Sequence, residues 1–206
     1  MPRGRPRKID PQDALKTAMH TLWEQGYDRT SMADLVSATG MAKPGLYANL
    51  GDKDEIFQKA LRLYQEEIGA PLIKDLVHSP DSLKQSLRTA LRGVLHAQEG
   101  SGLPEGCFII NNIFSCSAQS EHLKQALQDL NVERRNAFLL RLKRAQTECE
   151  LPASTDINAI ADFFAGQAAA ISSMAQAGLS PTELERMIDV SLSVLPAGPA
   201  RGGDQG

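Results

Sequence analysis

Apolar residues recur three and four positions apart along most of the chain, the spacing that predicts amphipathic helices. No segment alternates apolar and polar residues as a half-buried strand would. Helices are expected over residues 10–25, 30–40, 43–50, 52–70, 83–95, 107–116, 123–151, 156–178 and 180–195. Pro71 is expected to stop the fourth helix, because proline lacks the amide hydrogen that a helix interior needs. The sequence therefore predicts an all-α fold of about nine helices.

The stretch at residues 30–57, TSMADLVSATGMAKPGLYANLGDKDEIF, carries the clearest signals of helix beginnings and ends. Thr30 and Ser31 are of the types that cap a helix N-terminus, and Gly40 is able to take the left-handed conformation that ends a helix. Pro44 is tolerated only in the first turn of the helix that follows. Two short helices joined by a tight turn, then a capped third helix, form a helix-turn-helix. The second of these helices is able to lie in a major groove of DNA.

This stretch resembles the DNA-binding half of the TetR family of bacterial repressors. The residues that carry the resemblance are Thr30, Leu35, Val36, Gly40, Met41, Lys43, Leu46, Tyr47, Lys53, Glu55 and Ile56. Two positions depart from the family pattern: Gly45 stands where a serine or threonine often supplies a phosphate-bonding hydroxyl, and Leu50 replaces an aromatic residue. The resemblance implies a three-helix DNA-binding domain at residues 10–70 and a helical effector-binding and dimerisation domain at residues 71–195.

The resemblance also implies which residues meet a double-stranded operator. The expected DNA-binding residues are Arg3, Arg5, Arg7, Thr30, Ser31, Lys43, Pro44, Gly45, Tyr47, Asn49 and Lys53. Lys43, Tyr47 and Lys53 are expected to hold phosphates together with the basic arm at residues 1–9. The surface nearest the base edges is expected to comprise Pro44, Gly45 and Asn49, with Tyr47 able to reach either.

The overall charge gives this hypothesis no support, because the formal net charge is −3 at pH 7. Up to Phe57, eight lysines and arginines are balanced by eight aspartates and glutamates. Positive charge gathers instead at the arm, at Lys43 and at Lys53, and local placement is what phosphate contact requires. The arm and the Gly/Pro-rich tail at residues 196–206 have little with which to bury themselves, so both are expected to be disordered in the free protein.

Hydrophobic residues at 42% and charged residues at 23% are ordinary for a soluble globular protein. No run of about eighteen apolar residues is present to span a membrane. The N-terminal MPRGRPRK lacks the apolar core of a secretory signal. Three cysteines without a CxxC pair suit a reducing compartment. A cytoplasmic protein without a membrane partner is expected.

The expected helix at residues 156–178 is rich in alanine, glycine and serine and is apolar on more than one face. Such a helix needs partners on several sides. One alternative is burial within a single subunit. The other, which the resemblance favours, is a homodimer interface shared with the helix at 180–195, because two recognition helices on a palindromic site require a twofold protein. The interface residues expected are Phe164, Ala168, Ile171, Met187 and Leu192.

Signals of catalysis and of metal binding are weak. The four histidines are isolated, without an HExxH or other paired spacing, and no glycine-rich phosphate loop follows a strand. No metal, no cofactor and no enzymatic activity are therefore expected.

Cys107 is the one residue with a candidate chemistry. It follows Gly106 at an expected helix start, where the positive end of the helix dipole favours a thiolate and raises reactivity. With the later RAQ…EL segment at 144–151, this Gly-Cys resembles a branch of the TetR family in which some members sense electrophiles or oxidants. The alternative is a small buried hydrophobe, which is the usual role of a free cysteine. Asn111 and Asn112 lie inside the apolar run, and one of them, with Asn111 as the candidate, is expected to face either an effector cavity or solvent.

The leading hypothesis is a homodimeric transcriptional regulator that is released from a palindromic operator by an unknown small molecule or by modification of Cys107. One alternative is a helical small-molecule-binding protein without DNA binding, favoured only by Gly45 and the neutral N-terminal half. Another is a thiol-dependent enzyme at Cys107, which would show turnover where a sensor shows stoichiometric modification.

Overall fold

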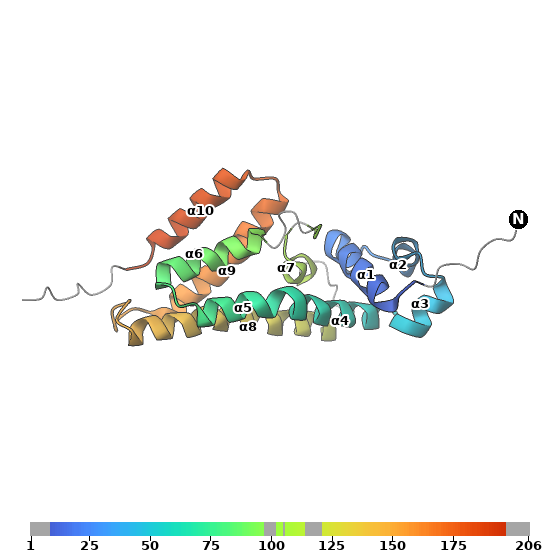
Figure 1. Cartoon of the computed structure of the whole chain (residues 1–206), viewed down its shortest axis with the longest axis horizontal. Coiled ribbons are helices and arrows are strands. Elements are labelled where there is room, and N and C mark those ends of the chain that lie inside the picture. The colour runs from blue at the N-terminus through green and yellow to red at the C-terminus, as the bar shows by residue number, and fades with distance from the viewer. Residues whose placement is uncertain (1–8, 97–101, 105, 114–120, 197–206) are drawn as a thin grey trace, which may run out of the picture. The chain divides into compact units, whose positions relative to one another are not determined.

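The computed structural model describes residues 9–96, 102–104, 106–113 and 121–196, and every regular element in these ranges is helical (Figure 1). The elements are α1 (Pro11–Gln25), α2 (Met32–Thr39), α3 (Lys43–Leu50), α4 (Lys53–Tyr64), the π-helical turn η1 (Gln65–Gly69), α5 (Ala70–His78), α6 (Leu83–His96), α7 (Phe108–Ile113), α8 (Glu121–Thr147), α9 (Ile157–Gln176) and α10 (Pro181–Ser193). Because α4, η1 and α5 follow one another without a break, the described ranges contain nine separate helices, as predicted. None of them is long and apolar enough to cross a membrane.

The prediction that Pro71 stops a helix is wrong. The chain stays helical to His78, because Pro71 falls in the first turn of α5, where a missing amide hydrogen is tolerated. The π-helical turn Gln65–Gly69 directly precedes this turn and changes the hydrogen-bond register there.

Local caps set many of the helix ends, and Ser31 and Gly40 cap α2 where the sequence predicts them. Gly40 ends α2 in the left-handed conformation, with φ of 65°. Asp10 and Asp156 accept hydrogen bonds from the first amides of α1 and α9. Capping boxes begin α2, α4 and α10, with the pairs Ser31–Asp34, Asp52–Glu55 and Ser180–Glu183.

The chain folds as two compact units. The first unit takes in the described residues up to Glu67 and those of Phe108–Leu127, and the second takes in those of Ile68–Cys107 and from Gln128 onward. This division differs from the expected domain at 71–195, because α7 and the start of α8 belong to the first unit. Phe108 explains the difference, since its fully buried ring lies 5.5 Å from that of Phe57 and 5.4 Å from that of Tyr64.

The core of the second unit draws on α5, α6, α8, α9 and α10. Four of the five residues expected at a dimer interface lie inside it, at 0–2% exposure: Phe164, Ala168, Ile171 and Leu192. These side chains are packed within one subunit, which corrects the expectation, and Met187 is partly buried against the same core. The large exposed apolar side chains of α9, α10 and the residue after α10 are instead Met174, Val190 and Val194.

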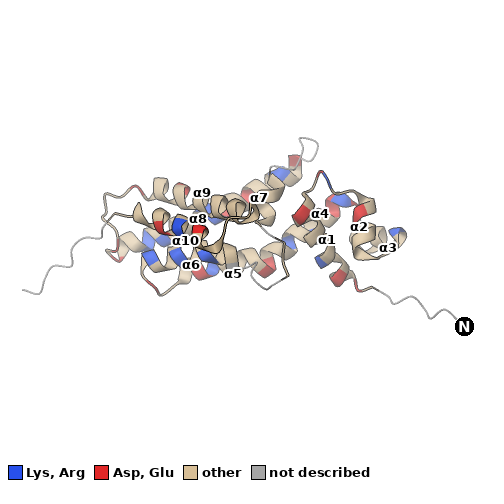
Figure 2. Cartoon of the chain, turned by 90° about the horizontal axis from the view of Figure 1, so that it is seen from above, with Lys and Arg blue, Asp and Glu red and all other residues tan. Residues whose placement is uncertain are grey.

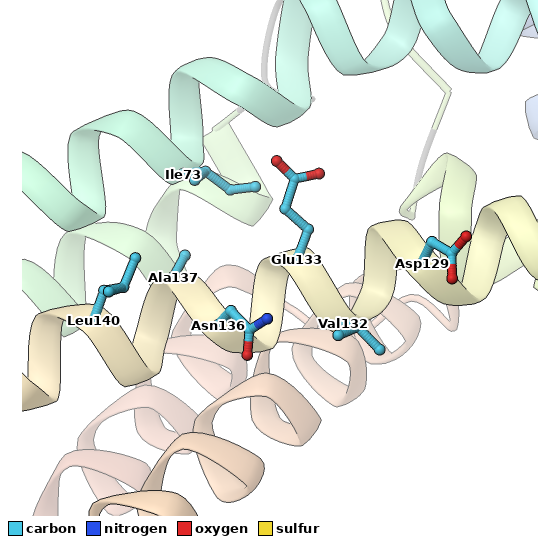
Figure 3. Close-up of a pocket in the computed structure, with 7 residues that line it drawn as sticks. All are labelled: Ile73, Asp129, Val132, Glu133, Asn136, Ala137 and Leu140. Carbon is cyan, nitrogen blue, oxygen red and sulfur yellow. The ribbon is translucent and has the colours of Figure 1, made fainter.

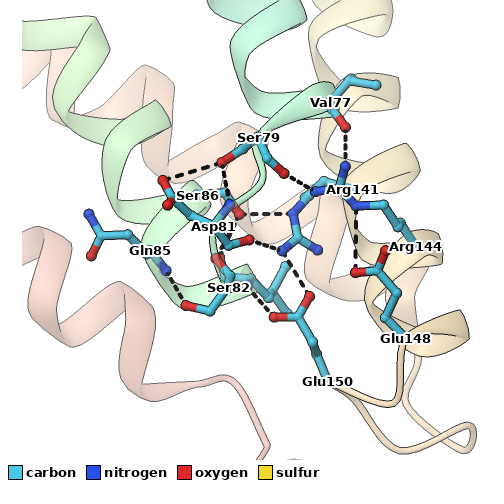
Figure 4. A network of polar contacts seen from close by, with 11 residues as sticks. Val77, Ser79, Asp81, Ser82, Gln85, Ser86, Arg141, Arg144, Glu148 and Glu150 are labelled. Carbon is cyan, nitrogen blue, oxygen red and sulfur yellow. Dashed lines mark hydrogen bonds and ion pairs between the residues drawn. The ribbon is translucent and has the colours of Figure 1, made fainter.

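A buried polar network joins α5, α6 and α8 inside the second unit (Figure 4). The guanidinium of Arg141 is fully buried and donates to the Ser86 hydroxyl at 2.9 Å and to the Asp81 carbonyl at 2.9 Å. It also pairs with the Glu150 carboxylate at 2.8 Å, and that carboxylate accepts a hydrogen bond from the Leu83 amide at the start of α6. Arg141 thus fixes the connection between α5 and α6 against α8.

Candidate nucleic-acid interface

Helix α3 presents one face to the core and the other to solvent. Leu46 and Leu50, four residues apart, are 0% and 4% exposed, because residues at this spacing share a face. Lys43, Pro44 and Asn49 are exposed, and Tyr47 is 43% exposed. The exposed face of α3 therefore carries the side chains that the helix-turn-helix pattern assigned to DNA, and Gly45 is half-buried beside them.

The charge of this face suits a polyanion. Helix α3 contains no acidic residue, whereas α1, α2 and α4 all do (Figure 2). Lys43 supplies its single charge, at the first position of the helix. A phosphate approaching α3 therefore meets one cation and no carboxylate on the helix itself.

Lys53 begins α4, the helix after α3, and its position is fixed by an aromatic ring. Its ammonium lies 4.1 Å from the ring centroid of Tyr27, a cation–π distance. The hydroxyl of the same tyrosine donates to the Asp54 carboxylate, which is the next residue of α4. Tyr27 thereby contacts two consecutive residues in the first turn of α4.

The two residues expected at the start of α2 differ in their surroundings. Ser31 is exposed, and its hydroxyl and amide hydrogen-bond with Asp34, which lowers the pKa of that carboxyl. Thr30 is 1% exposed, and its hydroxyl donates to the Gly26 carbonyl at 2.8 Å. Thr30 is therefore a structural residue of the α1–α2 connection, which corrects the expected DNA contact.

Lys59 is a residue of this region that the sequence pattern missed. Its ammonium donates to the carbonyls of Leu50 at 2.8 Å and of Asn49 at 3.4 Å, at the C-terminal end of α3. A cation there satisfies carbonyls that the helix leaves open and complements its dipole. The contact spans two helices, so no local signal predicts it. The arm residues Arg3, Arg5 and Arg7 lie outside the described residues.

The sulfur of Cys107 lies next to a cation. Cys107 is 7% exposed and directly precedes α7, as predicted, and the Arg134 guanidinium approaches its sulfur to 3.9 Å. Asn111 is half-buried, and its side-chain nitrogen donates to the Trp23 carbonyl near the end of α1 at 3.4 Å. Its side chain therefore lies against α1. The neighbouring Asn112 is completely buried, so it does not face solvent.

A groove of about 390 Å³ runs between α5 and α8 in the second unit. Ile73 of α5 and Glu133 of α8 project into it from its two sides (Figure 3). The rest of its lining comes from α8: Asp129, Val132, Asn136, Ala137 and Leu140. The mixture of apolar side chains and carboxylates is suited to a small amphipathic molecule.

Known proteins resemble the chain over nearly its whole length. Residues 14–60 match the family of bacterial regulatory proteins called the tetR family, and residues 83–190 match the tetracyclin repressor-like C-terminal domain. The HTH-type transcriptional repressor ComR of Escherichia coli is 29% identical over 194 residues, covering 94% of this chain and 92% of ComR. The uncharacterized HTH-type transcriptional regulator YezE of Bacillus subtilis is 29% identical over 193 residues, covering 93% and 99%.

A solved structure gives the same answer. A cysteine mutant of the TetR family transcriptional regulator CifR, complexed with 26-bp double-strand operator DNA, superposes with a TM-score of 0.85 at 27% identity. The match covers 94% of this chain and 100% of that one. The family matches thus take in both the N-terminal and the C-terminal parts of the chain. The chain therefore belongs to the tetR family of bacterial regulatory proteins, as a DNA-binding transcriptional regulator.

Proposed function

We propose that the protein is a homodimeric repressor that binds a palindromic operator through α3 and is released by a small molecule or by modification of a thiol. The observation that carries the proposal is the exposed face of α3, which presents Lys43, Pro44, Tyr47 and Asn49 above a buried Leu46. A relative named as a repressor and a similar structure bound to operator DNA support it. The protein acts by binding and not by turnover.

Phosphate contacts are assigned to Lys43 and Lys53, with the arm residues Arg3, Arg5 and Arg7 reaching phosphates or the minor groove. Base contacts are assigned to the middle of α3. The amide nitrogen of Asn49 donates to the Gly45 carbonyl at 2.7 Å, so it exchanges this bond for a base edge on binding.

The dimer is proposed to form through α9 and α10, by the face that the subunit core leaves exposed. Met174, Val190 and Val194 are 37%, 69% and 47% exposed, and Gly166 on α9 is also exposed. Apolar and small side chains on one helix pair permit close approach to a second copy. A twofold protein then meets two half-sites about one turn of DNA apart.

Two routes for the releasing signal remain open. One is Cys107, a buried thiol whose sulfur lies 3.9 Å from the Arg134 guanidinium. A covalent adduct on this buried side chain has to displace Arg134 or the start of α7. The other route is a non-covalent ligand in the groove between α5 and α8. Either acts only through a difference in affinity for the DNA-bound and released states.

The test of DNA binding is a fluorescence-anisotropy titration on the duplex that the wild-type protein selects from a random-sequence pool. The double variant Lys43→Ala, Tyr47→Ala is expected to lose specific binding while remaining a dimer by analytical ultracentrifugation. Lys74→Ala, an exposed cation on α5, is the matched control and is expected to bind like wild type. Binding that survives the double variant would place the recognition surface elsewhere.

The two signals are separated with N-ethylmaleimide. If Cys107 is the sensor, modification abolishes DNA binding by wild type and by Cys149→Ser, which lacks the exposed thiol. Modification then leaves DNA binding by Cys107→Ser unchanged. If modification does not change DNA binding by wild type, the thiol route is excluded and a non-covalent ligand in the groove is favoured.

A further inference from the structure

The side-chain amide of Asn112 makes three hydrogen bonds inside the first unit. Its oxygen accepts a hydrogen bond from the Tyr27 amide at 2.8 Å. Its nitrogen donates to the carbonyls of Leu22 at 3.3 Å and of Phe108 at 2.8 Å. The side chain is 0% exposed. One residue of α7 thus fixes the end of α1, through a contact between residues 85 positions apart.

Asn112 holds the backbone of Tyr27, and the side chain of Tyr27 contacts the start of α4. Tyr27 places its ring 4.1 Å from the ammonium of Lys53 and donates its hydroxyl to Asp54. Its ring also meets that of Phe57 edge-on, at 5.1 Å between centroids. The backbone of Tyr27 is therefore fixed by α7, and its side chain is fixed by α4.

We infer that Asn112 is a positioning residue for DNA binding: through Tyr27 it holds Lys53 where that lysine meets a phosphate. This inference rests on the proposed function, which assigns Lys53 to a phosphate. It makes the affinity for DNA depend on how α7 is seated against α1.

The salt dependence of binding separates positioning from a general loss of folding. Each phosphate that a cation neutralises contributes about 0.9 to the slope of log affinity against log salt. Loss of folded protein lowers the active fraction and leaves that slope unchanged. If Asn112 positions Lys53, Asn112→Leu is expected to reduce the slope by up to about 0.9 and to weaken binding about tenfold, as one lost charged contact does.

The experiment is a double-mutant cycle on the full-length protein, with the duplex selected by wild type from a random-sequence pool. The variants are Asn112→Leu, Lys53→Met and the double variant, titrated by fluorescence anisotropy at several salt concentrations. Positioning predicts that Lys53→Met reduces the slope in wild type and has no further effect in the Asn112→Leu background. Lys74→Ala, which removes an exposed charge of α5 and leaves the contacts between α7 and α1 intact, is the control and is expected to keep the wild-type slope.

Additive losses, or an unchanged slope in folded Asn112→Leu, would overturn the inference while leaving the proposed function in place. A wild-type protein that selects no duplex would overturn the proposed function itself. If Asn112→Leu does not fold by circular dichroism, Tyr27→Leu decides the matter, because it removes the ring next to the Lys53 ammonium and keeps the hydrogen bond from the backbone amide of residue 27 to Asn112. Positioning through Tyr27 predicts a reduced slope for this variant, and a wild-type slope would contradict it.

Discussion

Gly45 is the position at which this chain departs from the family pattern in a way that DNA binding should report. It lies in the first turn of α3, in helical conformation. A Cβ added there would lie 3.4 Å from Cγ and 3.8 Å from the sulfur of Met41. These are van der Waals contacts with a flexible side chain, so Gly45→Ser and Gly45→Ala fit without moving the backbone.

The two substitutions have different expected effects on stability and on affinity. Replacing a helical glycine raises the free energy of unfolding by about 1 kcal/mol for alanine and by about 0.5 kcal/mol for serine. A hydroxyl that donates to a phosphate contributes about 1.5 kcal/mol, which corresponds to roughly tenfold tighter binding. Gly45→Ser is thus expected to be the tighter DNA binder of the two and the less stabilised.

Urea unfolding followed by circular dichroism measures the stabilities, and fluorescence anisotropy on the selected duplex measures the affinities. Equal affinities for Gly45→Ser and Gly45→Ala would show that this position does not face a phosphate. Weaker binding by both would show that DNA approaches Gly45 too closely for any side chain. A destabilised Gly45→Ala would refute the packing argument at Met41.

Three further predictions concern the rest of the fold. Arg141→Met should lower the free energy of unfolding by about 3 kcal/mol because it breaks a buried ion pair. Arg135→Met on the same helix, whose aspartate partner is largely exposed, should leave urea unfolding nearly unchanged. The stabilising cap of Asp34, whose pKa lies below its ordinary 3.8, is present above that pH and is lost as the pH falls through the lowered pKa. Ser31→Ala should therefore reduce the fall of Tm that accompanies acidification below the ordinary pKa of 3.8. Val190→Glu should yield a folded monomer by ultracentrifugation, since that side chain is 69% exposed in the subunit.

Most helix ends could be predicted because the interactions that set them are local. Ser31 bonds within four residues of itself, and Ser180 does the same at the start of α10. Gly40 needs only its own freedom to take a positive φ. The exposed face of α3 follows from the same local logic, because burying Leu46 and Leu50 leaves the remaining positions to solvent.

The choice between a core and an interface could not be made from α9 alone. A helix that is apolar on several faces needs several partners, and periodicity does not say which partner belongs to the same chain. Phe164 and Ile171 turned out to face the subunit core, while Met174 on the same helix remains exposed. The prediction that a helix stops at Pro71 also failed. A π-helical turn precedes this proline and places it in the first turn of α5, so the helix continues.

Buried polar residues were the hardest to place, yet their sequence context was already informative. Asn112 interrupts the apolar run FIINNI, and Arg141 lies three or four positions from the buried apolar residues Ala137, Phe138 and Ala145 of α8. A polar residue at a buried position is unfavourable unless a partner satisfies it, and here the partners are 85 and 55 residues away. The conflict with the local pattern therefore indicates that a distant contact exists, though not which one. For Asn112 the distant partner is Tyr27, whose ring lies next to the Lys53 ammonium. A residue without any exposed surface therefore becomes a candidate for controlling DNA affinity.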